Sequence, residues 1–371
     1  MNPKLSSAIS LLPIGLLAGV LLVFNPWLLF PFMHVRTLLL GFFPFLAFYP
    51  IADRWIGKLD RDGNLDTWER LVYSAFLSFG LACATAFLLL TLHVAYPIMI
   101  FTLSLLLIAA SWGWWRTFLF EIRNSFDLFP KNVARVETMI LAIALLLAFS
   151  AGILPPLGYD AHEYHLPVPE KYLKAGGWMA FPENVYAAFP MNVELLYLWP
   201  LAAQSPSGCT AINLLLAGFS AVAVWRLGQR WGLSPDNLLA PIVFLSTGLV
   251  LRLILQANID LALTFSAVIL LLAYERYRED SRRVDIVMMI LAFGFAFGSK
   301  YISALSIGLP FIVMLLWDFR RIREKQLIVP LLGAMVGGVL LYSPWAIRNA
   351  ILYNNPFYLL LTPILVGTPA F

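Results

Sequence analysis

The sequence predicts an all-α fold, a polytopic bundle of transmembrane helices with one long external loop. Of its 371 residues, 61% are hydrophobic and only 12% are charged, whereas an ordinary soluble domain has roughly half and a quarter. The mean hydropathy is +0.81. Hydrocarbon cannot hydrogen-bond a bare backbone, so each long apolar run is read as a helix that crosses the bilayer. This composition excludes a soluble enzyme.

The apolar runs indicate about eleven spans. They lie near residues 8–30, 36–52, 71–93, 96–118, 138–154, 207–227, 238–254, 259–275, 286–299, 301–317 and 327–343. The first four form an N-terminal extension, residues 1–135. The other seven form a second module, residues 136–371, which carries an external loop at 155–206.

The basic residues predict the orientation. Short loops rich in Lys and Arg stay in the cytoplasm, and a cytoplasmic N-terminus places all but six of the 25 basic residues there. The six others are Arg36, Lys171, Lys174, Arg252, Lys300 and Arg348. We interpret the cytoplasmic clusters as solvated loops, and the net charge of +4 reflects these loops. The expected protein is a multi-pass protein of the inner membrane, with membrane lipids around it. Nucleic acid is not an expected partner.

The external loop carries a dense group of titratable side chains. Pro155 and Pro156 end the fifth span, and Asp160, His162, Glu163 and His165 follow within ten residues. Long ordered loops in compact folds are usually functional, so we expect chemistry here. A structural alternative stays open, because Asp160 and Glu163 also have the spacing of a helix capping box.

A short helix is predicted over residues 169–175. Gly176 would end it, and Glu170 with Lys174 would form an ion pair one turn apart. We expect this helix to lie along the membrane interface, with Tyr172 and Leu173 toward lipid and the charges toward water.

Several segments resemble bacterial GT-C glycosyltransferases, especially the RgtA/B/C/D-like enzymes and the aminoarabinose and protein mannosyl transferases. The resemblance covers roughly residues 138–360 in family order. It rests on YDAHEYHLP (159–167), FPMNVELLYLWPLA (189–202), NIDLALTFSAVILLLAYER (258–276), GFAFGSK (294–300) and PWAIRNAILYNNPFY (344–358). The family's module of seven spans, with a long loop after its first span, has the same layout as residues 136–371.

The resemblance implies an activity. Such enzymes move a sugar from a polyprenyl-phosphate donor to a lipid, glycan or protein acceptor on the external, periplasmic side, with inversion at the anomeric carbon. By this match Asp160 is the base, with Glu163 beside it in the catalytic group. A carboxylate can remove the acceptor proton, and a phosphate leaving group needs no strong acid.

Other side chains are candidates for binding the substrates. Lys300 and Arg348 stand at predicted outer ends of spans, where a cation serves a site or snorkels to the interface. We expect both to bind the donor phosphate, together with His165. His162, Tyr164 and Asp260 are candidate substrate contacts, although Tyr164 also suits an interfacial anchor and Asp260 a polar turn.

No cofactor is expected. His162 and His165 are weak candidates for a divalent cation, since two histidines with loosely spaced acids are a poor metal signature. Polar packing or phosphate hydrogen bonding are the alternatives.

One competing function stays open. Relatives usually continue beyond the position of Phe371, and this chain adds four N-terminal spans, which suits a non-catalytic GT-C-derived subunit of a larger membrane complex. A transporter would usually show charged, broken helices in paired halves, and we find no such pairing in the sequence.

Overall fold

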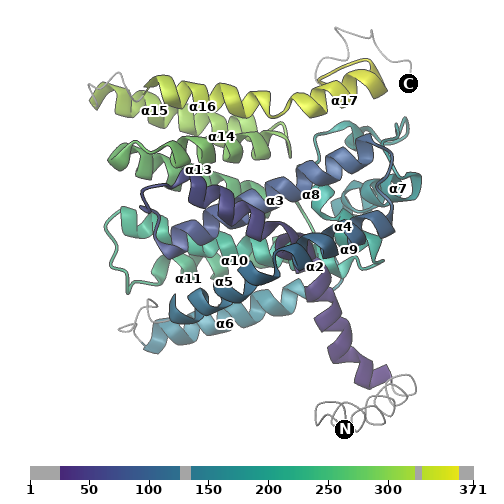
Figure 1. Ribbon diagram of the computed structural model, residues 1–371, viewed down its shortest axis with the longest axis horizontal. Coiled ribbons are helices and arrows are strands. Elements are labelled where there is room, and N and C mark those ends of the chain that lie inside the picture. The colour runs from purple at the N-terminus through teal and green to yellow at the C-terminus, as the bar shows by residue number, and fades with distance from the viewer. Residues whose placement is uncertain (1–25, 126–134, 322–327, 359–371) are drawn as a thin grey trace.

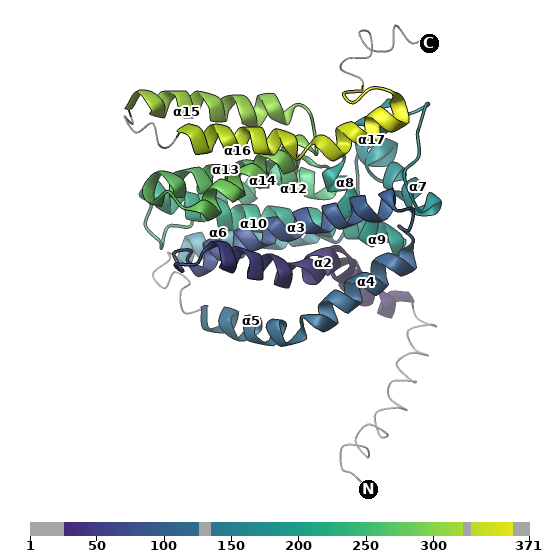
Figure 2. The ribbon, with the colours of Figure 1, turned by 45° about the horizontal axis from the view of Figure 1, so that its top comes forward.

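The computed structural model describes residues 26–125, 135–321 and 328–358, and every regular element in these ranges is a helix. The longer helices lie side by side across the view of Figure 1, and the short helices α7, α8 and α9 gather at one end of them. Figure 2 shows α4 and α5 as a bent pair on one side of the bundle and α15, α16 and α17 on the other. The all-α prediction is confirmed for the described residues.

The α-helices outside residues 155–206 follow the predicted apolar runs, except α17, which begins where the last run ends. They are α2 (Pro26–Leu59), α3 (Thr67–Thr91), α4 (Pro97–Ala110), α5 (Trp112–Ser125), α6 (Arg135–Gly152), α10 (Ser207–Arg230), α11 (Leu239–Ser246), α12 (Gly248–Leu255), α13 (Asp260–Asp280), α14 (Arg283–Phe297), α15 (Leu309–Arg321), α16 (Ile328–Leu340) and α17 (Ser343–Tyr353). The predicted run 8–30 lies mostly outside the described residues.

Among the described residues, fewer helices than the predicted eleven spans have the length and composition to cross a membrane. Within the described ranges, three single helices are long and apolar enough to cross a bilayer: Met33–Leu59 within α2, α3 and α10. The pair α4 and α5, bent by 61°, is a fourth if it counts as one span. The apolar helices support a membrane protein, but the count of about eleven spans is not confirmed.

The N-terminal helices and the later helices share one core. Helix α3 packs on α2, α10, α13 and α14, and its buried face belongs to the same hydrophobic cluster as theirs. Gly41 lets α2 approach α10, because a Cβ there would lie 2.5 Å from the Cβ of Ala211. The division at residue 135 stays a prediction.

One expectation about the basic clusters is wrong. Arg276 is 1% exposed and pairs with Glu69, also 1% exposed, and with Asp285 at 3.1 Å. Arg230 lies 2.7 Å from Glu69, and the Tyr73 hydroxyl donates to Asp285 at 2.9 Å. These arginines are not solvated loop residues, because acidic side chains on α3 and α14 compensate their charge inside the protein.

Residues 155–206, called the external segment after their predicted side of the membrane, form five short helices. They are η2 (Ala161–His165), α7 (Pro167–Ala175), η3 (Val185–Ala188), α8 (Asn192–Leu196) and α9 (Leu198–Ala202). Helix α7 ends at Gly176, which has φ +69°, and the Lys174–Glu170 ion pair forms at 2.7 Å. The expected lipid-facing side is wrong, since Tyr172 and Leu173 are buried in the protein core.

Candidate active site

The start of the external segment is tied to the turn between α12 and α13. The Leu157 backbone N–H donates to the Leu255 carbonyl at 2.7 Å. Gly158 has φ +144° and faces the Gln256 side chain, so a Cβ there would be strained as well as crowded. Helix α13 begins at Asp260, a few residues after this turn. The backbone therefore brings the Asp160 segment beside Asp260.

Asp160 does not cap a helix. Its backbone is helical, with φ −59° and ψ −36°, and its side chain makes no capping hydrogen bond. The side chain is exposed. The capping alternative is therefore wrong for Asp160, and its carboxylate stays available to solvent or substrate.

Tyr164 is subject to the charges of three carboxylates. It belongs to η2, a π-helical turn, a form often found at functional sites, and its ring stacks on Tyr186 with centroids 4.8 Å apart. Burial raises the pKa of Tyr164 above its usual value, and the charges of Glu194, Asp160 and Asp260 raise it further. The phenol stays protonated, with three carboxylates around it.

A solvent-accessible ion pair closes this side of the cluster. Lys300 Nζ lies 3.4 Å from Asp260 Oδ1, and the two side chains are 39% and 37% exposed. Lys300 follows the end of α14, and Asp260 is the first residue of α13. The structure thus pairs Lys300 with Asp260 directly, and it places Asp160 and Asp260 close enough to Tyr164 to raise its pKa.

A buried pair lies beneath this cluster. His165 Nδ1 is 2.7 Å from Glu194 Oε1, and the side chains are 1% and 2% exposed. Sequence reasoning placed His165 on the donor phosphate, but its burial favours a role in positioning the neighbouring Tyr164. The sequence analysis did not single out Glu194. A lone acidic residue in the apolar stretch VELLYLW could have indicated a buried ion pair, because Glu is rarely buried without a partner.

His162 and Glu163, the other predicted residues of the segment, make separate hydrogen bonds. His162 Nε2 lies 3.2 Å from the Pro156 carbonyl, and the Glu163 carbonyl accepts from Asn184 Nδ2 at 3.2 Å. His162 thus contacts a backbone carbonyl, whereas His165 is buried against Glu194, so the two histidines have separate partners. Among the described residues no three His, Cys, Asp or Glu side chains could hold a metal ion together.

Arg348 has a different setting from Lys300. It is 4% exposed, donates to the Ala187 carbonyl at 3.1 Å, and lies over the rings of Trp345 and Trp178 at 4.8 and 5.4 Å. The side chain joins α17 to the external segment. Its predicted phosphate contact stays a prediction, and these contacts favour docking of the loop.

Part of the chain is similar to a known protein family. Residues 201–347 match the family model described as dolichyl-phosphate-mannose-protein mannosyltransferase. This family belongs to the GT-C superfamily, so the resemblance inferred from the sequence is confirmed. The matched segment, residues 201–347, contains Asp260 and Lys300, whereas Asp160 and Tyr164 precede it. Neither the curated proteins nor the solved structures compared with the chain give a match.

Proposed function

We propose that the chain is an inverting membrane glycosyltransferase that takes its sugar from a polyprenyl-phosphate donor. The description of the matching family names a lipid-phosphate-linked sugar and a protein acceptor, and we carry over only the class of donor. One observation supports the proposal most: the Leu157–Leu255 hydrogen bond holds the segment of the exposed Asp160 at the turn before Asp260, which pairs with Lys300, and both carboxylates are close enough to Tyr164 to raise its pKa. We place the reaction on the side of the membrane where residues 155–206 lie.

The proposed reaction is a single displacement. Asp160 takes the proton of an acceptor hydroxyl while that oxygen bonds to the anomeric carbon. The bond from this carbon to the donor phosphate oxygen breaks, and its electron pair leaves with the phosphate. Lys300 stabilises the departing charge, which a charge-assisted contact does more strongly than a neutral one. Tyr164, held protonated, donates a hydrogen bond to the sugar or acceptor.

The first test of this function is a transfer assay with Asp160→Asn. The purified chain in nanodiscs is supplied with a panel of polyprenyl-phosphate hexoses and pentoses, and transfer to acceptor is measured. Asn keeps the shape but cannot take a proton, so transfer should fall by about 100-fold or more. Thermal stability should not change, since Asp160 makes no capping bond. Glu163→Gln should cost less.

A second arm tests the phosphate contact. Lys300→Gln should weaken donor binding by about tenfold or more, the effect of losing a charged hydrogen bond. Lys174→Gln is its control, an exposed lysine of the same side of the protein that pairs only with Glu170. Unchanged transfer by Asp160→Asn would contradict the base assignment. A folded wild-type chain that transfers no sugar from any donor would favour the non-catalytic subunit.

A further inference from the structure

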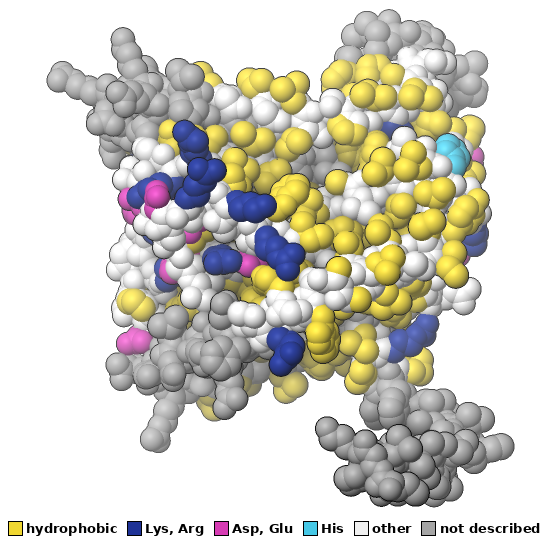
Figure 3. Space-filling view, viewed as in Figure 1, with side chains coloured by type: hydrophobic (Ala, Val, Ile, Leu, Met, Phe, Trp, Pro, Cys, Tyr) yellow, Lys and Arg dark blue, Asp and Glu magenta, His cyan; other side chains and the backbone are white. Residues whose placement is uncertain are grey.

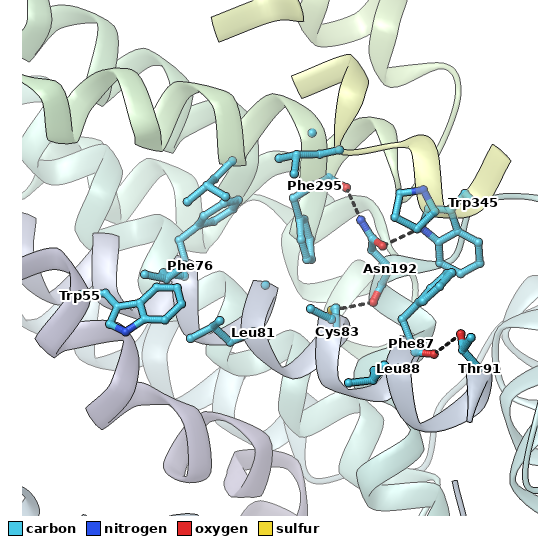
Figure 4. A pocket seen from close by; sticks show the side chains of 17 residues that line it. Trp55, Phe76, Leu81, Cys83, Phe87, Leu88, Thr91, Asn192, Phe295 and Trp345 are labelled. Atoms are coloured by element: carbon cyan, nitrogen blue, oxygen red, sulfur yellow. Dashed lines mark hydrogen bonds between the residues drawn. The ribbon is translucent and has the colours of Figure 1, made fainter. Parts of the chain in front are cut away.

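An apolar groove of about 540 Å³ runs along α3 on the side of α14 and α17. In Figure 4, Trp55 of α2 stands at one end of it, and Thr91 and Trp345 stand at the other. Nearly all of its lining is hydrocarbon or aromatic ring. Phe76 and Thr91 are fifteen residues apart on one helix, so the groove extends about 22 Å along α3. That is most of a hydrocarbon core about 30 Å thick.

The polar side chains at the end near Thr91 are hydrogen-bonded within the protein. Asn192 accepts from Trp345 Nε1 at 2.8 Å and donates to the Phe295 carbonyl at 3.2 Å, as Figure 4 shows. Its backbone carbonyl accepts from Cys83 Sγ at 2.9 Å, and the Thr91 hydroxyl accepts from Trp178 Nε1 at 3.0 Å. These partners leave this end suited to the apolar tip of a ligand, not to its head.

The end near Trp55 is open and basic. Trp55 is 51% exposed, a position typical of an aromatic side chain at the membrane interface. Lys58 lies three residues further on the same face of α2 and is exposed, as is Arg54. In Figure 3 most of the visible charged side chains lie in the half of this face away from α7. A negatively charged head group therefore has its counter-charge at this end.

We propose that the groove holds one acyl chain of an anionic phospholipid, with its phosphate beside Lys58. The chain would be drawn from the leaflet on the Lys58 side, opposite the external segment. It is thus a lipid distinct from the sugar donor, and the proposal does not depend on the proposed function. The acyl chain fills the space between α3 and the helices α14 and α17. Within a bilayer, dispersion contacts hold the chain there and surface charge holds its head group, since exclusion of water contributes little.

Gly80 offers a specific way to block the groove. It lines the groove, and a Cβ built on it meets nothing within 4 Å. Gly80→Leu therefore places a side chain in the space of the acyl chain without a clash. Gly218 on α10 is the matched control, since a Cβ there also meets nothing within 4 Å and it is not part of the lining. Ala84→Leu, one turn further along the groove, is a second blocking variant.

The experiment uses the full chain in nanodiscs of phosphatidylcholine with a minor fraction of phosphatidylglycerol. A phosphatidylglycerol with a photoactivatable acyl chain is cross-linked, and the labelled peptides are mapped by mass spectrometry. We expect label on α3 and α14, lost in Gly80→Leu or Ala84→Leu and kept in Gly218→Leu. Lys58→Gln should lower the labelling by about fivefold, the effect of one basic residue at an anionic surface.

Competition identifies the lipid. Unlabelled phosphatidylglycerol should displace the probe, and phosphatidylcholine should not. Three results would overturn the proposal: unchanged labelling in both groove variants, equal competition by phosphatidylcholine, or stronger competition by a polyprenyl phosphate, which would assign the groove to the donor. Labelling needs no turnover, so an inactive enzyme would leave this test intact.

Discussion

His165 Nδ1 lies 2.7 Å from Glu194 Oε1, and both side chains are buried. The pair joins the short helices η2 and α8 through two residues that are 29 positions apart in the chain. Among the described residues, His165 Nε2 and Glu194 Oε2 have no hydrogen-bond partner. A buried polar pair of this kind is costly to break, because each group left alone keeps the desolvation penalty. The pair therefore fixes the segment that carries Tyr164 and follows Asp160.

We expect Glu194→Ala to destabilise the protein. It leaves the buried His165 Nδ1 without an acceptor, which should lower the free energy of unfolding by about 1–3 kcal/mol. Glu194→Gln keeps an acceptor and should cost less. Thermal unfolding in detergent measures both, with Glu183→Ala as control, since Glu183 is 66% exposed and lies 3.7 Å from Lys171. Equal stability of Glu194→Ala and Glu183→Ala would show that the pair contributes nothing.

The buried pair of Glu69 and Arg276 leads to a second prediction. Glu69→Gln removes the charge that compensates Arg276 and Arg230, and breaking a buried pair on one side typically costs about 3–5 kcal/mol. Asp62→Asn is the control, because its pair with Arg282 is exposed and should be worth less than about 1 kcal/mol. Thermal unfolding should show a large shift for the first variant only. Similar small shifts for both would mean that water reaches the Glu69 cluster.

The positions of the helices were predictable because apolar runs are local signals. Each described run coincides with one helix or with two consecutive helices. Which face of a helix meets lipid was not predictable, as Tyr172 shows, because an apolar face looks the same whether lipid or protein covers it. The arginine clusters were misjudged for a related reason. Arg276 and Glu69 are 207 residues apart, and composition near Arg276 gives no sign of this partner.

The candidate site was predictable in its members but not in its assembly. Asp160, Asp260 and Lys300 stood out as polar groups at predicted ends of spans, where ionisable residues are costly without a role. Their proximity depends on the Leu157–Leu255 hydrogen bond and on the turn before α13, which no local pattern encodes. Arg348 looked equivalent to Lys300 in the sequence, and only the burial of its side chain distinguishes the two.

The orientation of the chain can be tested by chemical labelling. Lys174→Cys lies on the external segment, where the native side chain is 71% exposed, and Asp280→Cys lies at the exposed end of α13. The native cysteines, Cys83 and Cys209, are buried and should give little background. An impermeant maleimide added to intact cells should label Lys174→Cys and spare Asp280→Cys until the membrane is opened. The opposite order would reverse the predicted topology and move the proposed reaction to the cytoplasm.

Two roles of Arg348 can be distinguished by experiment: holding the external segment in place and binding the donor phosphate. Its guanidinium holds the Ala187 carbonyl, and its neighbour Asn349 donates to the Ala188 carbonyl at 2.8 Å. Contacts of the cation with the faces of Trp345 and Trp178 are each worth about 0.5–2 kcal/mol. We therefore expect Arg348→Gln to release the segment 177–191, seen as faster cleavage there in limited proteolysis and a lower Tm.

Arg348→Lys should be intermediate, because it keeps the charge but loses the planar fork. The control is Arg278→Gln, since Arg278 also lies over a ring, that of Tyr274 at 5.6 Å, but is 36% exposed and far from the external segment in the chain. A drop in donor affinity for Arg348→Gln with unchanged proteolysis would instead support a phosphate contact. Faster cleavage without loss of donor affinity would leave Lys300 as the cation that meets the phosphate, because only Lys300 of the two is open to solvent beside Asp260.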